Sequence, residues 1–132
     1  MATIRKEITI PTDPADAWDA IRDFGGVHER LAAGFVTATR MDGGDRIVTF
    51  VNGSSARERL VAVDEDRRRL VYSVVDSGLG FAHHQASAEI VDGDGGETRF
   101  IWTTDLLPDE LAPVIDQMMD QGAEAITRTL GG

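Results

Sequence analysis

The spacing of apolar and polar residues changes along the chain and predicts where helices and strands lie. Residues 3–10 carry β-branched residues in partial alternation with polar ones, which predicts a strand. The segment Asp13-Pro14-Ala15-Asp16 is typical of a helix start, because proline suits the first helical position and an acidic residue complements the helix dipole. Trp18 and Ile21 mark the buried stripe of this helix, and residues 27–33 are expected to form a second short helix.

From Gly34 to Thr104 the pattern changes to strand-like segments separated by turn residues. The predicted strands are residues 34–41, 46–51, 55–63, 69–76, 82–91 and 97–104. Loops rich in Gly, Asn and Asp separate them, and these residues tolerate the positive φ of tight hairpin turns. The segment therefore predicts an antiparallel meander without crossover helices.

The last predicted element is a long helix that begins near Asp109. Its apolar stripe, at three- and four-residue steps, consists of Leu111, Val114, Ile115, Met118, Met119, Gly122, Ile126 and Leu130. The fold class is therefore α+β, with two short helices after the first strand and a seven-stranded sheet. One long helix can shield a sheet of this size only if the sheet curves around it.

Small residues on the facing surfaces of helix and sheet predict an open space between them. The middle of the helix carries Gly122, Ala123 and Ala125, and strand 82–91 offers Ala82, Ala86 and Ala88. Side chains this small do not fill a wedge between the two layers. The alternative interpretation is close backbone packing without a cavity.

Composition and charge narrow the range of possible functions. The 132 residues suit one domain, 1–132, and the absence of cysteine excludes disulfides and thiolate chemistry. With 23 acidic against 13 basic residues, the net charge of −10 disfavours nucleic acid as a partner. Neither an apolar leader nor a run of roughly 18–20 apolar residues is present, so we expect a cytoplasmic protein without membrane insertion.

Four segments carry a resemblance to a known family. They are Asp16-Ala17-Trp18-Asp19-Ala20-Ile21-Arg22-Asp23-Phe24, Glu58-Arg59-Leu60 followed by Asp64, Arg69-Leu70-Val71-Tyr72-Ser73-Val74-Val75, and Thr98-Arg99-Phe100-Ile101-Trp102 followed by Pro108. In order and spacing they resemble the START/Bet v 1-like superfamily (SRPBCC), which includes bacterial polyketide cyclase/dehydrase-like proteins and plant abscisic-acid receptors. The resemblance spans the chain and implies the helix-grip fold.

The sequence also departs from this family. Leu31-Ala32-Ala33-Gly34 stands where the family often has a Trp-Pro pair, and Asn52-Gly53-Ser54-Ser55 replaces the gate sequence of the receptors. Hormone-dependent phosphatase binding is therefore not implied.

Strand alternation and similarity to pocket positions of the family assign the residues that face a ligand. They are Thr37, Val48, Phe50, Glu58, Leu60, Tyr72, Val74, Phe81, His84, Ala86, Trp102, Met118, Gly122 and Ile126. In the seventh strand a slip of one residue would turn Phe100 and Trp102 to the other face. The loop at residues 76–81 is either a lid or a plain hairpin connection.

The candidates for acid–base chemistry are Glu58, Tyr72 and His84. A carboxylate at Glu58 is costly among apolar neighbours unless a partner charge compensates. It could hold a ligand hydroxyl or act as general acid or base, with Tyr72 and His84 as partners. The alternatives are an ion pair of Glu58 with an arginine on the solvent face and a purely structural or exposed His84. No metal site or cofactor is expected, since His83 and His84 point to opposite faces of one strand.

The sequence is compatible with three functions. The leading hypothesis is binding of a lipid, polyketide, isoprenoid-like or similar amphipathic molecule in a pocket between sheet and helix. The second is a cyclase or dehydratase that uses the acid–base candidates, and the third is a protein-interaction module with a filled core. A homodimer is compatible with the sequence, which carries no signal for or against it.

Overall fold

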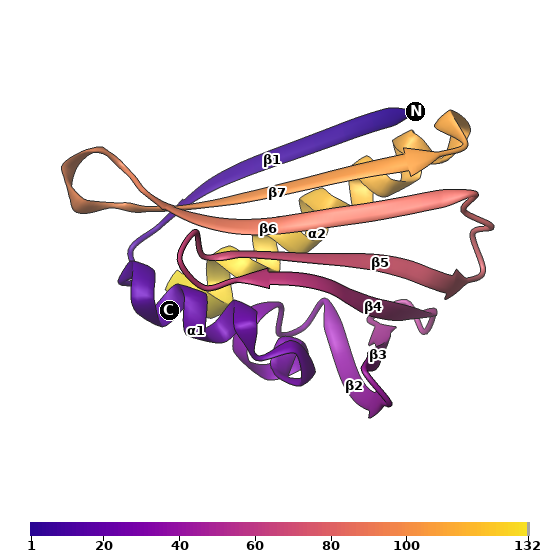
Figure 1. Cartoon of the computed structure of the whole chain (residues 1–132), viewed down its shortest axis with the longest axis horizontal. Coiled ribbons are helices and arrows are strands. Elements are labelled where there is room, and N and C mark those ends of the chain that lie inside the picture. Colours follow the sequence, from indigo (N-terminus) through magenta and orange to yellow (C-terminus); the bar gives the residue numbers. More distant parts are fainter. Residues whose placement is uncertain (132) are drawn as a thin grey trace.

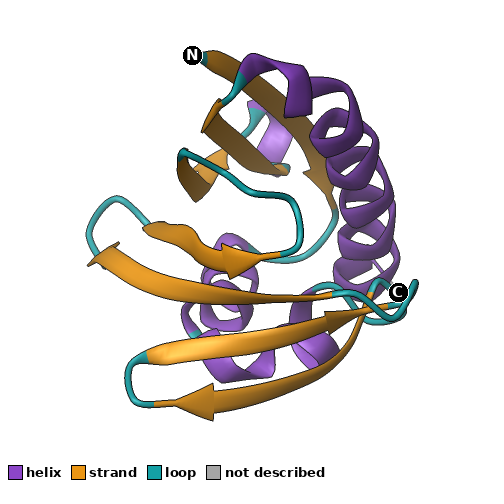
Figure 2. Cartoon of the chain, turned by 90° about the vertical axis from the view of Figure 1, so that its right-hand side faces the viewer, coloured by secondary structure: helices purple, strands orange, loops and turns teal. Residues whose placement is uncertain are grey.

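A computed structural model describes residues 1–131, Asp94 by its backbone alone, and shows an antiparallel sheet curved around a long helix (Figures 1 and 2). The order of elements confirms the α+β helix-grip architecture. The strands are β1 (Ala2–Ile10), β2 (Val36–Asp42), β3 (Asp45–Phe50), β4 (Ser55–Asp64), β5 (Arg69–Ser77), β6 (His83–Asp92) and β7 (Thr98–Leu107). The helices are α1 (Pro14–Arg22), the short η1 (Phe24–Gly26), η2 (Val27–Leu31), η3 (Asp94–Gly96) and η4 (Asp109–Leu111), and the long α2 (Ala112–Gly131).

The seven strands form one sheet in the order β1-β7-β6-β5-β4-β3-β2. Strands β2 to β7 form the predicted meander, and β1 pairs antiparallel with β7 from Ala2↔Leu106 to Ile10↔Thr98. Breaks in register occur in β2 between Val36 and Ala38 and twice in β4. Bulges of this kind bend a strand and increase its twist, which lets the sheet curl.

Helix α2 lies closest to the β1 side of the sheet. Its buried face consists of Ile115, Met119, Gly122, Ala123, Ala125 and Ile126. On β1, Lys6 Nζ approaches the carboxylates of Asp116 at 2.7 Å and Asp120 at 2.8 Å. Hydrogen bonds to these two α2 residues raise the pKa of Lys6. Because α2 lies over this side, the space over the central strands is left to α1, η2 and the large side chains of the sheet.

The buried apolar residues form two clusters. The smaller cluster joins Ile4, Leu106, Ile115 and Met119 at one end of the molecule. The larger cluster packs α1, η1 and η2 against the central strands. Among the described residues, Trp102 and Met118 are the half-buried side chains that contact both clusters. The region around these two side chains is therefore where the core is divided.

Leu106 and Leu60 give a test of this core. Leu106 is 0% exposed within the smaller cluster, whereas Leu60 is 38% exposed on β4. We expect Leu106→Ala to lower the free energy of unfolding by about 2–5 kcal/mol, because it leaves a cavity. Leu60→Ala is the matched control and should cost less than about 1 kcal/mol. Urea denaturation measures both, and equal losses would contradict the placement of Leu106.

Candidate functional site

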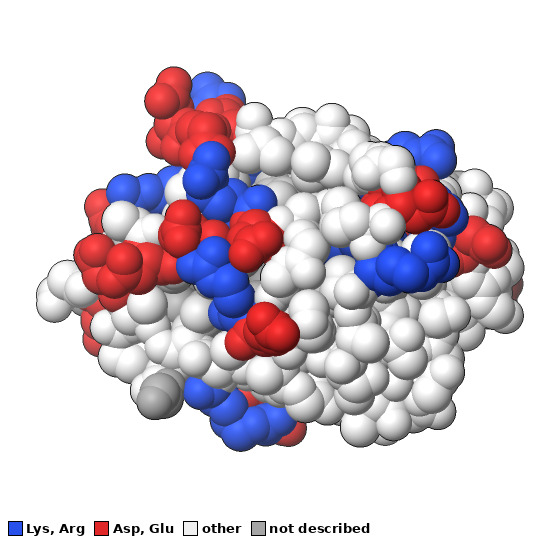
Figure 3. Space-filling model, turned by 90° about the horizontal axis from the view of Figure 1, so that it is seen from below, with Lys and Arg blue, Asp and Glu red and all other residues white. Residues whose placement is uncertain are grey.

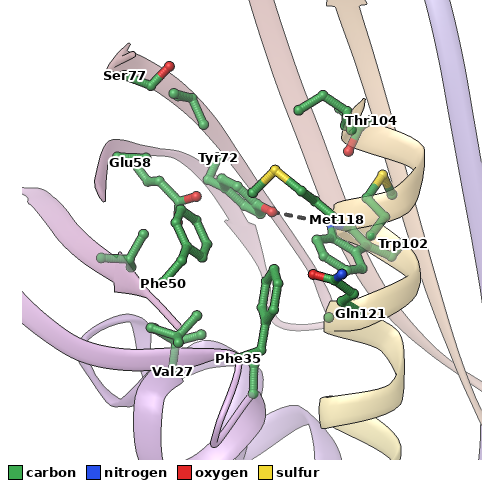
Figure 4. A pocket seen from close by; sticks show the side chains of 18 of the residues that line it. Val27, Phe35, Phe50, Glu58, Tyr72, Ser77, Trp102, Thr104, Met118 and Gln121 are labelled. Carbon is green, nitrogen blue, oxygen red and sulfur yellow. Dashed lines mark hydrogen bonds between the residues drawn. The ribbon is translucent and has the colours of Figure 1, made fainter. Parts of the chain in front are cut away.

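A cavity of about 580 Å³ lies between the concave face of the sheet and α2. Its walls come from α1, from η2 and the loop after it, from strands β2 to β7, and from α2. Figure 4 shows Phe35 and Phe50 on one side and Met118 and Trp102 on the other, with a hydrogen bond drawn between Tyr72 and Trp102. Most of the surface is apolar, and the polar side chains come from the strands, from the loops and from α2.

Gly122 shows how small residues shape the cavity. A Cβ atom at this position would lie 2.9 Å from Cη2 and Cζ3 of Trp102, so the glycine lets the indole rest against α2. Ala88 on β6 is 5% exposed and also lines the cavity. The two interpretations of the small residues therefore both hold in part. Gly122 serves close packing, and an open space remains beside it.

Most of the predicted ligand-facing residues line this cavity. They are Val48, Phe50, Glu58, Tyr72, Val74, Phe81, His84, Trp102, Met118, Gly122 and Ile126. Phe100 also lines it, so both Phe100 and Trp102 of β7 face inward as assigned. Whether these side chains contact a ligand stays a prediction.

Three assigned residues lie outside the cavity lining. Thr37 is exposed at the break in β2, where its hydroxyl donates to the Thr49 carbonyl at 3.2 Å. Leu60 precedes the second break in β4, and both faces of this end of the strand are exposed because no element covers them. Ala86 is 1% exposed in the core, and its short side chain ends below the cavity surface. Strict alternation fails at Thr37 because a bulge interrupts it, whereas Leu60 lies opposite Tyr72 but at the exposed end of β4.

Glu58 forms a buried ion pair with Arg46. Arg46 Nε donates to Glu58 Oε1 at 2.7 Å, and the side chains are 7% and 9% exposed. The guanidinium also donates to the Phe24 carbonyl at 3.1 Å and lies 3.9 Å from the Phe24 ring centroid. The expected arginine partner of Glu58 is present, but the pair lies at the cavity wall and not on the solvent face. This corrects the predicted location of that alternative.

Tyr72 and His84 are held by hydrogen bonds of their own. Trp102 Nε1 donates to Tyr72 Oη at 3.2 Å, and the Val74 backbone N–H donates to His84 Nδ1 at 3.0 Å. Burial raises the pKa of Tyr72 well above its usual value, with the charge of Glu58 adding to the effect. Burial lowers the pKa of His84 to about 4. At neutral pH both side chains are therefore uncharged, and the proton of His84 lies on Nε2.

The three acid–base candidates do not form a relay. Within residues 1–131, their hydrogen bonds go to Arg46, Trp102 and the Val74 backbone, and none joins two of the three. The Tyr72 and His84 rings lie 6.0 Å apart between centroids. The arrangement offers fixed polar groups around an apolar space and no chain for proton transfer.

Sequence reasoning missed several residues that line the cavity. Arg46 shares the strand parity of Val48 and Phe50, and Thr104 that of Trp102, so alternation alone would have found both. Phe35 lies in the loop before β2, where no periodic signal exists. Its ring packs against Phe50 with centroids 5.3 Å apart.

Three segments surround the opening of the cavity. They are the β3–β4 turn with Asn52, Ser54 and Ser55, the β5–β6 loop with Ser77, Gly78 and Leu79, and the exposed side of α2 with Val114, Gln117 and Gln121. Leu79 and Val114 are 37% and 40% exposed. The predicted lid segment 76–81 thus lies at the opening, and its mobility stays a prediction.

Across residues 1–131 no group of three His, Asp or Glu side chains is placed to hold a metal ion. No helix in this part of the chain has the length and apolarity to cross a bilayer.

The comparisons with known proteins agree with this architecture. Residues 1–131 match the family of polyketide cyclases/dehydrases and lipid transport proteins, and the chain belongs to this family. No curated protein matches the sequence.

Solved structures show the same fold at low sequence identity. The protein XoxI from Bacillus cereus is 17% identical with a TM-score of 0.87, covering 98% of this chain and 96% of its own. A protein from Thermobifida fusca is 29% identical with a TM-score of 0.74, covering 98% and 95%. Norcoclaurine synthase from Thalictrum flavum, solved with dopamine and hydroxybenzaldehyde, is 18% identical with a TM-score of 0.73, covering 96% and 84%.

The buried ion pair makes a prediction about stability. Glu58→Leu leaves Arg46 as an unpaired buried cation, so we expect the free energy of unfolding to fall by about 3–5 kcal/mol. The double variant Arg46→Met/Glu58→Leu removes both charges and should come within about 2 kcal/mol of wild type.

A surface ion pair is the control for this experiment. The Asp19 side chain is 56% exposed and pairs with Arg30, so Asp19→Leu should cost less than about 1 kcal/mol. Chemical denaturation of the variants measures these differences. If the double variant were as unstable as Glu58→Leu, packing and not charge would be the cause.

The low pKa of His84 makes stability depend on pH. An unfolded histidine titrates near about 6.5, so between that pH and about 4 only the unfolded chain binds the proton. Acidification across this window favours unfolding, and His84 should account for a loss of up to about 3 kcal/mol. Urea denaturation from about pH 7 to about pH 4 should show a smaller loss for His84→Gln than for wild type. Identical pH profiles would show that His84 is not the group responsible.

Proposed function

We propose that this chain binds a small, largely apolar or amphipathic molecule, of lipid, polyketide or isoprenoid type, in the cavity between sheet and α2. The observation that carries the proposal is the cavity of about 580 Å³ with its mostly apolar lining. Ligand-binding pockets typically measure about 300–1,000 Å³ and bury most of the ligand surface. The family to which the chain belongs includes lipid transport proteins, which supports the same class of ligand.

The size of the lining allows a useful affinity. Burial of about 300 Å² of apolar ligand surface at about 25 cal/mol per Å² contributes roughly 7 kcal/mol before the costs of association. Apolar contact alone therefore supplies at most about the free energy of micromolar binding, since the costs of association are still to be subtracted. Tighter binding requires a hydrogen bond from one of the fixed polar groups.

Binding is favoured over catalysis by the state of the polar side chains. Glu58 is held by Arg46, and both Tyr72 and His84 are neutral with an acceptor position already occupied. A general base needs a free acceptor near the substrate. The hypothesis of an interaction module with a filled core is disfavoured by the cavity itself.

The charge distribution supports a small molecule over nucleic acid. On the face in Figure 3, acidic and basic side chains lie beside one another in mixed groups at both ends of the molecule. Several arginines are paired: Arg30 with Asp19 and Asp23, and Arg22 with Glu65. Paired arginines on a chain of net charge −10 do not provide the continuous basic surface that a phosphate backbone needs.

Cavity filling tests the proposal. N-phenyl-1-naphthylamine, a neutral apolar fluorescent probe, should bind saturably with one site, and native mass spectrometry should detect a small molecule retained during purification. Ala88→Leu places additional carbons in the cavity and should weaken probe binding about 10-fold or more, since the new side chain competes for the space.

The control is Ala62→Leu, the same substitution at an exposed position of β4 outside the cavity. It should leave the affinity unchanged. If the wild-type protein showed neither a retained molecule nor saturable probe binding, the proposed function would be wrong.

A further inference from the structure

Three neighbouring strands bring polar side chains together in the middle of the cavity. Tyr72 on β5, Ala86 on β6 and Thr104 on β7 occupy one row of the sheet, and His84 follows on β6. Because Ala86 is short, the side chains on either side of it extend over β6. Tyr72, His84 and Thr104 all line the cavity, and in Figure 4 the Tyr72 hydroxyl points toward Trp102 while Thr104 is drawn above the indole.

Tyr72 and His84 each already use an acceptor, whereas their donors are free. Tyr72 Oη accepts from Trp102 Nε1, and His84 Nδ1 accepts from the Val74 backbone. Over residues 1–131 no acceptor takes the Tyr72 O–H or the His84 Nε2–H, and both side chains line the cavity. The hydroxyl of Thr104 can rotate to donate or accept. Two neutral donors thus face an apolar space that supplies no partner for them.

The cavity also lacks a free positive charge. Of the described residues that line it, Arg46 is the one arginine or lysine, and its charge is balanced by Glu58 at 2.7 Å. His84 is neutral above about pH 4. A ligand carboxylate would lose its hydration without gaining a counter-charge, which is costly in an apolar site.

We propose that Tyr72 and His84 form an oxygen-binding subsite that selects an uncharged ligand with a carbonyl group over a free acid or a plain hydrocarbon. A carbonyl oxygen has two lone pairs and no proton, so it accepts from the Tyr72 hydroxyl and has a second position for His84 Nε2–H. A ligand hydroxyl brings a proton as well, and on these strands the Thr104 hydroxyl can accept it. This inference rests on the proposed function, because it requires that the cavity holds the ligand.

Trp102 has a positioning role in this subsite. Its indole N–H donates to Tyr72 Oη, so the hydroxyl proton of Tyr72 points away from Trp102. Gly122 allows the indole to lie against α2, since a Cβ there would meet the ring at 2.9 Å. The orientation of the Tyr72 donor therefore depends on contacts from β7 and α2 together.

Three tricyclic probes of nearly equal shape test the proposal. They are 9-fluorenone with a carbonyl, fluorene with a methylene in its place, and fluorene-9-carboxylate with a negative charge. Equilibrium dialysis should give fluorenone an affinity about 3- to 10-fold higher than fluorene, the range expected for one net hydrogen bond. Fluorene-9-carboxylate should bind more weakly than both.

Tyr72→Phe removes the donor and keeps the ring. It should reduce the preference for fluorenone over fluorene to within about twofold while changing the affinity for fluorene by less than about twofold. Thr103→Val is the control, because Thr103 lies on the opposite face of β7 and outside the cavity. It should preserve the preference.

Infrared spectroscopy supplies a readout that can be taken on the wild-type protein itself. The carbonyl stretch of fluorenone bound to the wild-type protein should lie at lower wavenumber than in hexane, because hydrogen bonding weakens the C=O bond. In Tyr72→Phe most of this shift should disappear.

The possible outcomes distinguish a failure of this subsite from a failure of the proposed function. If fluorene binds and fluorenone binds no tighter, the subsite is wrong and the apolar cavity stands. A fourth probe, 9-fluorenol, carries a hydroxyl in place of the carbonyl. If it bound more tightly than fluorenone, the subsite would select a hydroxyl and not a carbonyl. Tightest binding of fluorene-9-carboxylate would contradict the argument that the cavity lacks a free positive charge. If no probe binds, the subsite and the proposed function both fail.

Discussion

This structure depends on one constraint: a seven-stranded sheet is much wider than the single long helix that packs on it. Strands about 4.8 Å apart make a sheet about 29 Å across, whereas a helix with its side chains is about 10 Å wide. The sheet has to curve, and α2 lies near one side of it, tied to β1 through Lys6. The short helices and the aromatic side chains of the sheet cover part of the remaining face. What they leave uncovered is the cavity.

The polar side chains of the cavity are arranged before any ligand arrives. Arg46 and Glu58 neutralise each other, Trp102 orients Tyr72, and a backbone N–H orients His84. Groups fixed in this way lose little conformational freedom when a ligand binds, which favours affinity. The same contacts occupy the Nδ1 acceptor of His84 and one acceptor position each on Tyr72 and Glu58.

The fold was predictable from the sequence because its local signals agree with one another. Turn residues separate the strands, the stripe from Leu111 to Leu130 marks the long helix, and the segments shared with the family occur in order. Cavity positions were predictable on β5, β6 and β7, where the pairing is regular at Tyr72, His84 and Trp102. No local signal reveals the bulge that displaces Thr37 or the exposure of the end of β4 that leaves Leu60 outside the cavity.

The partners of the polar groups were not predictable, because they depend on contacts between strands. The pairing of Glu58 with Arg46 requires the register of β3 and β4, and the bond from Trp102 to Tyr72 crosses the whole of β6. In the sequence, a charged residue at an inward-facing position of a strand, such as Arg46, suggests that the strand has been assigned the wrong face until its ion-pair partner is known. Burial of the charge is explained only by the pair.

Xenon binding tests most directly whether the space between sheet and helix is open. An apolar cavity takes up xenon, as engineered apolar cavities do. A crystal of the protein under xenon pressure should show xenon among Phe35, Tyr72, Trp102 and Met118, and a bound apolar ligand should displace it. Electron density in which these side chains close together and exclude xenon would contradict the account.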